Sequence, residues 1–166
     1  MSLQHSITIP PVHPARRPLR LHPADPRANG RRPSLVIVDD DELLRDLLGE
    51  ALTAQGYDVR CAENGEAGWQ SLCAEPFDLI ITDFEMPKLN GLDLLRRMRA
   101  ASLNQPAILM SGNMPKRTPE LEQLLLPGAA VAKPFSFTNL LPDIAALLIL
   151  ANSGKTPHSL PIPAPV

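Results

Sequence analysis

The sequence predicts an α/β domain built on a doubly wound parallel sheet of five strands. Short apolar runs, typical of strands buried on both faces, alternate with longer segments whose apolar residues recur at helical spacing. Single helices between consecutive strands indicate right-handed crossovers, which place helices on both faces of a parallel sheet. In this architecture ligands bind at the carboxyl ends of the strands, so the residues that follow each strand are the candidates for function.

The strands are predicted from short runs rich in Val, Ile, Leu and Ala. The first, third and fourth are apolar throughout, the second resembles an edge strand, and the fifth is weak. In chain order they cover Leu35–Val38, Tyr57–Cys61, Phe77–Thr82, Ala107–Met110 and Ala129–Ala132.

The helices are predicted from apolar periodicity together with start and stop signals. Asp41, Asn64 and Thr118 are expected to cap helices, and Gly56 is expected to follow the end of the first. Because Pro127 and Gly128 stop the helix that begins after Thr118, that fourth helix is short. The predicted helices cover residues 42–55, 64–74, 91–101, a stretch of about two turns from 119, and 137–150.

Proline marks the ends of the predicted domain. Seven of the 19 prolines lie in residues 1–33 and four in residues 151–166, and neither end shows an apolar periodicity. Such segments bury too little apolar surface to offset the entropy of ordering them. We therefore expect a disordered Arg/Pro-rich arm at 1–33, a domain at 34–150 and a disordered Pro-rich tail at 151–166.

Charge is distributed unevenly along the chain, whose net charge is −2. Residues 1–33 contain six arginines and one acidic residue, whereas residues 34–150 contain 17 acidic and nine basic residues. The acidic body argues against nucleic-acid binding by the domain. The arm is interpreted either as a solvated tail or as a basic docking arm for acidic partners or lipid headgroups.

Location is predicted from what the sequence lacks. The longest apolar run, Ile144–Ala151, is far shorter than the ~18–20 residues of a membrane span, and no secretory signal is recognisable. Cys61 and Cys73 form neither a CxxC motif nor a zinc-site spacing. They are expected to be free thiols, which favours a cytoplasmic protein.

Polar residues follow four of the predicted strands. A lone acidic residue after a strand is usually a solvated charge or a helix cap, which is the role expected of Asp41, but several groups converging on one edge are improbable by chance. Converging carboxylates repel each other unless a cation holds them, and Mg²⁺ suits such oxygens. A lysine supplies a charge for phosphate oxygens. These groups describe an aspartate that attacks phosphorus and is held as an acyl phosphate. They are Asp39 and Asp40 after the first strand, Asp83 after the third, Ser111 after the fourth and Lys133 after the fifth.

Four stretches of the sequence resemble the receiver domain of bacterial two-component response regulators. They are LVIVDDDE (35–42), LIITDFEMPKLNGLDLL (79–95), ILMSG (108–112) and AKPF (132–135). The resemblance spans about residues 34–150. It implies a flavodoxin-like sheet with strand order 2-1-3-4-5.

The resemblance also implies a role for each candidate residue. Asp83 corresponds to the phosphoacceptor, and Ser111 and Lys133 to the groups that contact the phosphoryl oxygens. The Lys133–Pro134 bond is commonly cis in the family. The implied Mg²⁺ ligands are Asp39, Asp40, of which Asp40 is the more direct, Asp83 and the backbone carbonyl of Glu85.

The sequence departs from the common receiver pattern near the fourth helix and fifth strand. Gly128 lies only five residues before Lys133, and the fourth helix is short. Ala130 stands where many receivers have an aromatic residue that changes rotamer with phosphorylation. This pattern is closest to receivers of hybrid histidine kinases.

The expected function is that of a stand-alone phosphorelay protein without an output domain. It would accept a phosphoryl group from a histidine kinase or phosphotransfer protein and signal by contact, rather than turn over a small molecule as an enzyme. The first alternative is a receiver-fold interaction module that works without phosphorylation. The second is an aspartate-nucleophile phosphatase, which usually carries Asp as general acid at the position that Glu85 occupies here.

The last helix is predicted to form a partner interface. Leu140, Ile144 and Leu147 follow core spacing, which leaves Leu141, Leu148 and Ile149 off the buried stripe. Exposed leucines favour a homodimer or a kinase- or target-docking surface. Alternatively, Pro142 bends the helix so that both apolar faces meet the body.

Overall fold

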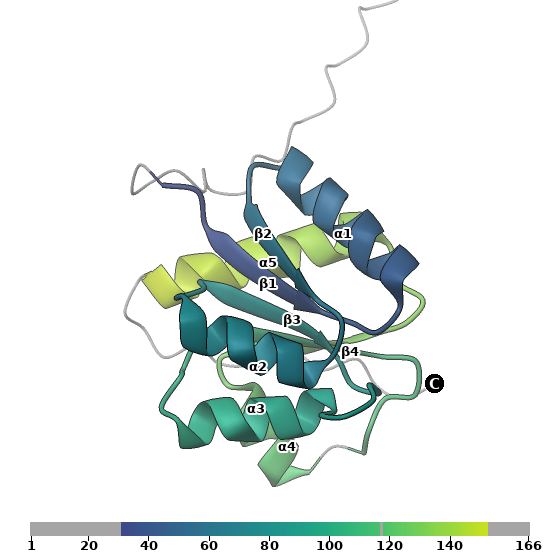
Figure 1. The fold of residues 1–166 in the computed structure, drawn as a ribbon, viewed down its shortest axis with the longest axis vertical. Helices are drawn as coiled ribbons and strands as arrows, with labels where there is room; N and C mark the ends of the chain where they lie inside the picture. Colours follow the sequence, from purple (N-terminus) through teal and green to yellow (C-terminus); the bar gives the residue numbers. More distant parts are fainter. Residues whose placement is uncertain (1–30, 117, 153–166) are drawn as a thin grey trace, which may run out of the picture.

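The computed structural model describes residues 31–116 and 118–152 and confirms the predicted fold class (Figure 1). Predicted and observed element boundaries agree to within about two residues. The strands are β1 (Ser34–Val38), β2 (Asp58–Ala62), β3 (Leu79–Asp83), β4 (Ala107–Ser111) and β5 (Gly128–Ala132). The helices are α1 (Glu42–Ala54), α2 (Gly65–Ala74), α3 (Gly91–Ala100), α4 (Pro119–Leu125) and α5 (Phe137–Asn152).

All strand pairs in the sheet are parallel, and the strand order is β2-β1-β3-β4-β5, as the family resemblance implies. Helices α1 and α5 pack on one face, and α2, α3 and α4 pack on the other (Figure 1). The carboxyl ends of the strands therefore meet at one edge.

The central strands place alternate side chains in two cores. Val36 and Ile80 belong to the cluster beneath α2, α3 and α4, whereas Leu35 and Ile37 belong to the cluster beneath α1 and α5. All four are fully buried. Removing apolar side chains from water on both faces stabilises the sheet by about 1.5–3 kcal/mol for each large side chain.

Side-chain caps begin four helices, three of them at the residues predicted from the sequence. Each capping side chain accepts a hydrogen bond from the backbone N–H three residues further on, which satisfies a donor that has no partner within the helix. Pro119 follows its cap directly, and α4 is as short as expected. The capping residues are Asp41, Asn64, Asn90 and Thr118.

Two glycines hold the loop that leaves β3. A methyl group on Gly91 would lie 2.0 Å from the backbone oxygen of Asp83, and one on Gly65 would lie 2.1 Å from the backbone oxygen of Leu89. Neither position accommodates a side chain, because such contacts are far inside van der Waals distance. This close packing fixes the backbone on which Asp83 stands.

The described body begins before the predicted boundary. The Arg31 guanidinium donates to both carboxylate oxygens of Asp78, at 2.9 and 2.6 Å, and the N–H of Asp58 donates to the Pro33 carbonyl at 2.9 Å. Residues 31–33, assigned to the arm from the sequence, are therefore bonded to the sheet. At the other end, α5 continues to Asn152. The predicted disorder of the remaining terminal residues falls outside the described residues.

Helix α5 buries more of its surface than predicted. Leu140, Ile144 and Leu147 are buried as expected, but Leu148 is only 6% exposed, so its predicted place off the buried stripe is wrong. Leu147 and Leu148 lie about 100° apart around the helix, and a contact face wide enough to hold both covers the sheet. Ile149 remains 45% exposed. The surface that α5 can offer to a partner is thus smaller than the sequence suggests.

Within the described part of the chain, no helix is both long enough and apolar enough to cross a bilayer.

Candidate functional site

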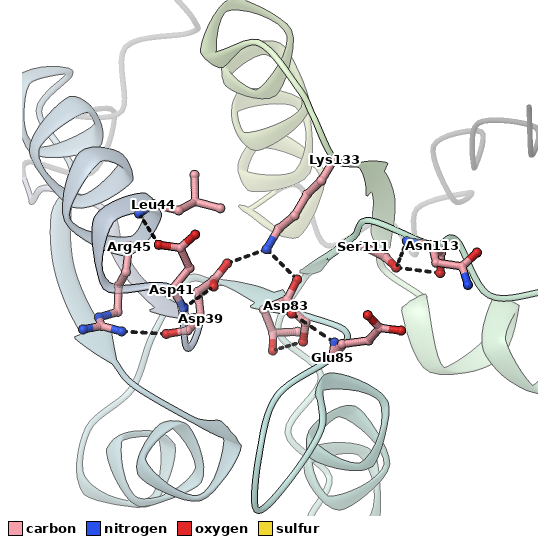
Figure 2. Close-up of polar contacts among 10 residues, drawn as sticks. Asp39, Asp41, Leu44, Arg45, Asp83, Glu85, Ser111, Asn113 and Lys133 are labelled. Carbon is pink, nitrogen blue, oxygen red and sulfur yellow. Dashed lines mark hydrogen bonds and ion pairs between the residues drawn. The ribbon is translucent and has the colours of Figure 1, made fainter.

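Four strands bring the predicted site residues to the carboxyl edge of the sheet. Asp39 follows β1, Asp83 ends β3, Ser111 ends β4 and Lys133 follows β5. Parallel pairing carries each strand to the same edge, and the backbone N–H of Lys133 donates to the Ser111 carbonyl at 2.8 Å. Figure 2 shows the side chains of Asp39, Asp83 and Lys133 pointing toward one another.

Lys133 bridges two buried carboxylates. Its ammonium nitrogen lies 2.9 Å from Oδ2 of Asp39 and 2.7 Å from Oδ1 of Asp83. The Asp39 side chain has no exposed surface, and that of Asp83 is 8% exposed. The two ion pairs compensate for much of the cost of burying these two carboxylates.

Asp40 completes a group of three carboxylates. One oxygen from each of Asp39, Asp40 and Asp83 lies within 4.8 Å of the others, with Asp40 exposed and the other two buried. A set made only of oxygens, open to solvent on one side, has the chemistry of a site for a hard divalent cation that keeps several water ligands. The residues present thus fit Mg²⁺.

Burial and charge shift the pKa values at the site. Burial raises the pKa of Asp83 above its ordinary value, the neighbouring Asp39 raises it further, and the hydrogen bond from Lys133 opposes both. Burial lowers the pKa of Lys133, but its hydrogen bonds to Asp39 and Asp83 outweigh this effect, and the pKa is raised overall. Lys133 therefore stays cationic, while the ionised form of Asp83 carries an energetic cost.

Backbone groups hold both buried carboxylates in place. The N–H of Glu85 donates to Oδ2 of Asp83 at 3.0 Å, and the N–H of Asp41 donates to Oδ1 of Asp39 at 2.9 Å. The Glu85 side chain itself is exposed. Each carboxylate thus has one oxygen bonded to Lys133 and the other to the backbone.

Ser111 reaches the same edge but has different partners. Its hydroxyl donates to the Asn113 carbonyl at 2.8 Å and accepts from the Asn113 N–H at 3.1 Å. Figure 2 shows this pair apart from the Lys133 bridge. The structure therefore places Ser111 beside the carboxylates without a bond to them.

Arg45 is a site residue that the sequence analysis missed. Its guanidinium donates to the backbone carbonyl of Asp39 at 2.8 Å and so ties α1 to the end of β1 (Figure 2). Its position in the first turns of a helix that starts directly after the acidic residues is a signal that could have been used.

A pocket of about 400 Å³ lies next to Asp40. Its wall includes Phe84, Met86 and Pro87 from the loop after β3, which gives the acidic site an apolar border.

Comparison with known proteins identifies a family for most of the domain. The model of the response regulator receiver domain matches residues 35–145. The probable transcriptional regulatory protein SilR of Salmonella typhimurium is 32% identical over 130 residues, which are 77% of this chain and 56% of SilR. The transcriptional regulatory protein CusR of Escherichia coli is 34% identical over 116 residues, which are 69% of this chain and 50% of CusR. The chain thus spans about half the length of these two curated relatives.

Solved structures agree with the family match. The response regulator protein TrrA of Thermotoga maritima, solved in complex with Mg²⁺ and BeF, has a TM-score of 0.63 and 30% identity over 69% of this chain and 98% of that one. TrrA in complex with the histidine kinase ThkA has a TM-score of 0.62 and 30% identity, covering 70% of this chain and 98% of that one.

Proposed function

Because the chain belongs to the response regulator receiver domain family, we propose that it accepts a phosphoryl group on Asp83 from a histidine kinase or phosphotransfer protein. The observation that carries this proposal is the contact of Lys133 with both Asp83 and Asp39, beside the carboxylate of Asp40. That arrangement holds the Asp83 carboxylate against the Lys133 ammonium and leaves carboxylate oxygens on the solvent side for a metal ion.

In the proposed reaction, a carboxylate oxygen of Asp83 attacks the phosphorus of a phosphohistidine. The P–N bond breaks, the imidazole nitrogen keeps the electron pair, and an acyl phosphate forms on Asp83. The Glu85 N–H and the Lys133 ammonium orient the attacking carboxylate, because they hold its two oxygens at 3.0 and 2.7 Å.

Asp39, Asp40, Asp83 and the backbone carbonyl of Glu85 are the proposed Mg²⁺ ligands. The ion would neutralise the negative charge that accumulates between the carboxylates and the arriving phosphoryl group. Lys133 has three N–H donors and uses two on Asp39 and Asp83. It can therefore donate to a phosphoryl oxygen without leaving the site.

Ser111 is proposed to exchange partners on phosphorylation. Its hydroxyl gives up its hydrogen bond to the Asn113 carbonyl and donates to a phosphoryl oxygen instead. The loop after β4 then loses one of its local bonds, which couples the phosphoryl group to the start of α4. Ala130 is buried on β5 and supplies no aromatic ring for such coupling.

The proposed output is contact with another protein rather than turnover of a small molecule. Of the three side chains predicted to face a partner from α5, Leu141 and Ile149 are left partly exposed for a homodimer or target interface, whereas Leu148 is buried. The acidic body is not expected to bind nucleic acid. A cytoplasmic location is proposed because both cysteines are free and exposed, as in a reducing compartment.

The test is phosphorylation of the full chain by acetyl phosphate and Mg²⁺, followed by intact-mass measurement. We expect one added phosphoryl group in the parent, none in Asp83→Asn, and one in the matched control Glu85→Gln, whose side chain is exposed. Labelling of Asp83→Asn to the level of the parent would refute the assignment. Absence of labelling in the parent would favour the interaction module that works without phosphate. Continuous release of phosphate from acetyl phosphate, without an accumulated phosphoprotein, would favour a phosphatase.

A further inference from the structure

The outer face of α1 is apolar at two positions where a helix on a protein surface is normally polar. Leu43 is 80% exposed and Leu47 is 62% exposed, the two largest exposures of any large hydrophobic side chain among the described residues. They are four residues apart and lie together on one face of the helix. Contact between water and two neighbouring leucine side chains is unfavourable, so this pair is a candidate surface for contact with another segment or protein.

An acidic stripe runs along α1 next to this pair. Glu42, Asp46 and Glu50 follow one another at intervals of four residues, and all three are exposed. None of them forms an ion pair within residues 31–116 and 118–152. The face is thus both apolar and negatively charged.

A groove borders the acidic stripe. Asp46 and Glu50 line it from α1, and Val59 and Cys61 line it from β2, around a volume of about 560 Å³. Because β2 is an edge strand of the sheet, no further strand of the described residues lies beyond it on this side of the groove.

The N-terminal arm of the chain contains a segment whose positive charges and leucines complement the acidic and apolar face of α1. Residues 16–21 read Arg-Arg-Pro-Leu-Arg-Leu, so that three arginines and two leucines lie within six residues. The segment lies in the N-terminal arm, which has six arginines and one acidic residue before β1 begins. Its arginines are complementary to the carboxylates of the α1 face, and its leucines can pack against the leucines of that face.

The arm starts close enough to reach this face. The Pro33 carbonyl accepts from the N–H of Asp58, four residues after α1 ends, so the root of the arm lies beside that end of the helix. Nine residues separate Leu21 from Arg31. When extended they span about 30 Å, whereas a helix of the length of α1 measures about 20 Å.

We propose that residues 16–21 dock on the outer face of α1 and over the groove between α1 and β2. Their arginines pair with Glu42, Asp46 and Glu50, and their leucines cover Leu43 and Leu47. Pro18 has no N–H to donate, so a strand of this segment added along β2 would lose a ladder hydrogen bond, and the proposed docking relies on side-chain contacts instead. A short tether gives an effective concentration of about millimolar, at which weak ion pairs suffice. Any partner that binds α1 must then displace the arm.

The two cysteines provide a test in the full-length chain. Cys61 lines the groove, whereas Cys73 is an exposed thiol on α2, on the opposite face of the sheet. Alkylation by iodoacetamide, a neutral reagent, is followed for each cysteine by peptide mass. In Arg16→Glu/Arg17→Glu/Arg20→Glu we expect Cys61 to react at least about threefold faster than in the parent, as for a groove covered about two thirds of the time. Cys73 should keep its rate, and the Arg→Lys triple variant should protect Cys61 like the parent.

Charge reversal on the helix distinguishes docking from a general effect of the arm. The face variant Asp46→Lys/Glu50→Lys should lose protection of Cys61, and adding the arm Arg→Glu changes should restore it. Comparing these two variants keeps the lysines near the thiol constant, and circular dichroism melts check that every variant folds.

Equal Cys61 rates in parent and arm variant, or no restoration in the combined variant, would overturn the proposal. Protection that disappears on dilution would assign the arm to a second copy of the chain. Protection seen only with anionic phospholipid vesicles would assign it to a lipid surface. Either result rejects docking within one chain.

Discussion

The Lys133 ammonium lies 2.9 Å from a carboxylate oxygen of Asp39, a side chain with no exposed surface. The same ammonium contacts Asp83 at 2.7 Å. One lysine cation thus pairs with two buried carboxylates. The stability and the chemistry of the site depend on this pairing of one positive with two negative charges.

Lys133→Met is expected to destabilise the fold by about 3–5 kcal/mol at neutral pH without Mg²⁺, because it leaves two buried carboxylates unpaired. Urea unfolding measures the change. The loss should shrink as the pH falls and the carboxylates become protonated. Lys88→Met is the control, since Lys88 is largely exposed and its nearest carboxylate, on Glu63, is 3.8 Å away. Equal stability of the two variants would show that the bridge contributes nothing.

Asp40→Asn is expected to abolish the rise in melting temperature that Mg²⁺ gives the parent, since binding to the native state alone stabilises it. Without Mg²⁺ the variant should melt slightly higher than the parent, because one of three close carboxylates is gone. Thermal melts with and without MgCl₂ measure both effects. Asp41→Asn keeps its helix cap and stands outside the cluster, so it should respond to Mg²⁺ like the parent. A parent-like Mg²⁺ response in Asp40→Asn would exclude Asp40 as a ligand.

Asp83→Asn should be more stable than the parent at neutral pH in the absence of Mg²⁺. Burial raises the pKa of Asp83 in the folded state, so ionisation is harder there than in the unfolded chain. Below the unfolded pKa both states are protonated and no cost exists. The cost appears as the pH rises toward the folded pKa and is constant above it, at about 1.4 kcal/mol for each pKa unit. The advantage of the variant should therefore vanish near pH 3, as measured by denaturant unfolding across the acidic range. An advantage that persists unchanged to pH 3 would contradict this origin.

Gly91→Ala is expected to destabilise the domain by more than about 2 kcal/mol, the scale of overpacking and backbone shifts. Its methyl group meets the Asp83 backbone oxygen, so the variant should also phosphorylate poorly if Asp83 is the acceptor. Gly112→Ala is the matched control, because nothing lies within 4 Å of its added methyl group and its φ needs no glycine. Chemical unfolding measures the difference in stability between the two variants. Equal stability would show that the loop after β3 shifts to accommodate the methyl group without an energetic cost.

The sequence predicted the parts of the site that depend on strand ends. Asp39, Asp83 and Lys133 meet because parallel strands deliver the residues after them to one edge, and apolar runs locate strands well. The bond of Ser111 to Asn113 was not predictable, since a hydroxyl chooses among nearby partners that only the loop geometry defines. Arg45 was missed because its partner is a backbone carbonyl, and the one sequence signal for it is its place in the first turns of the helix that follows the acidic residues.

The burial of Leu148 shows a second limit of the sequence. A periodic pattern gives the centre of a helix's buried face but not its width, and α5 packs against a sheet broad enough to bury both Leu147 and Leu148. Leu43 and Leu47 are the opposite case, apolar residues that the described residues leave exposed.

The bridge between Asp39 and Lys133 joins residues 94 positions apart. It closes only after β5, the last strand of the sheet to emerge from the ribosome, has paired with β4. Contacts of such long sequence separation form late and slowly, because the intervening chain must be ordered first. A nascent or prematurely terminated chain that ends before Lys133 would carry all three clustered aspartates without the cation that bridges two of them. The proposed phosphoacceptor site would therefore mature only when translation of the whole domain is complete, and truncated products would remain silent in the relay.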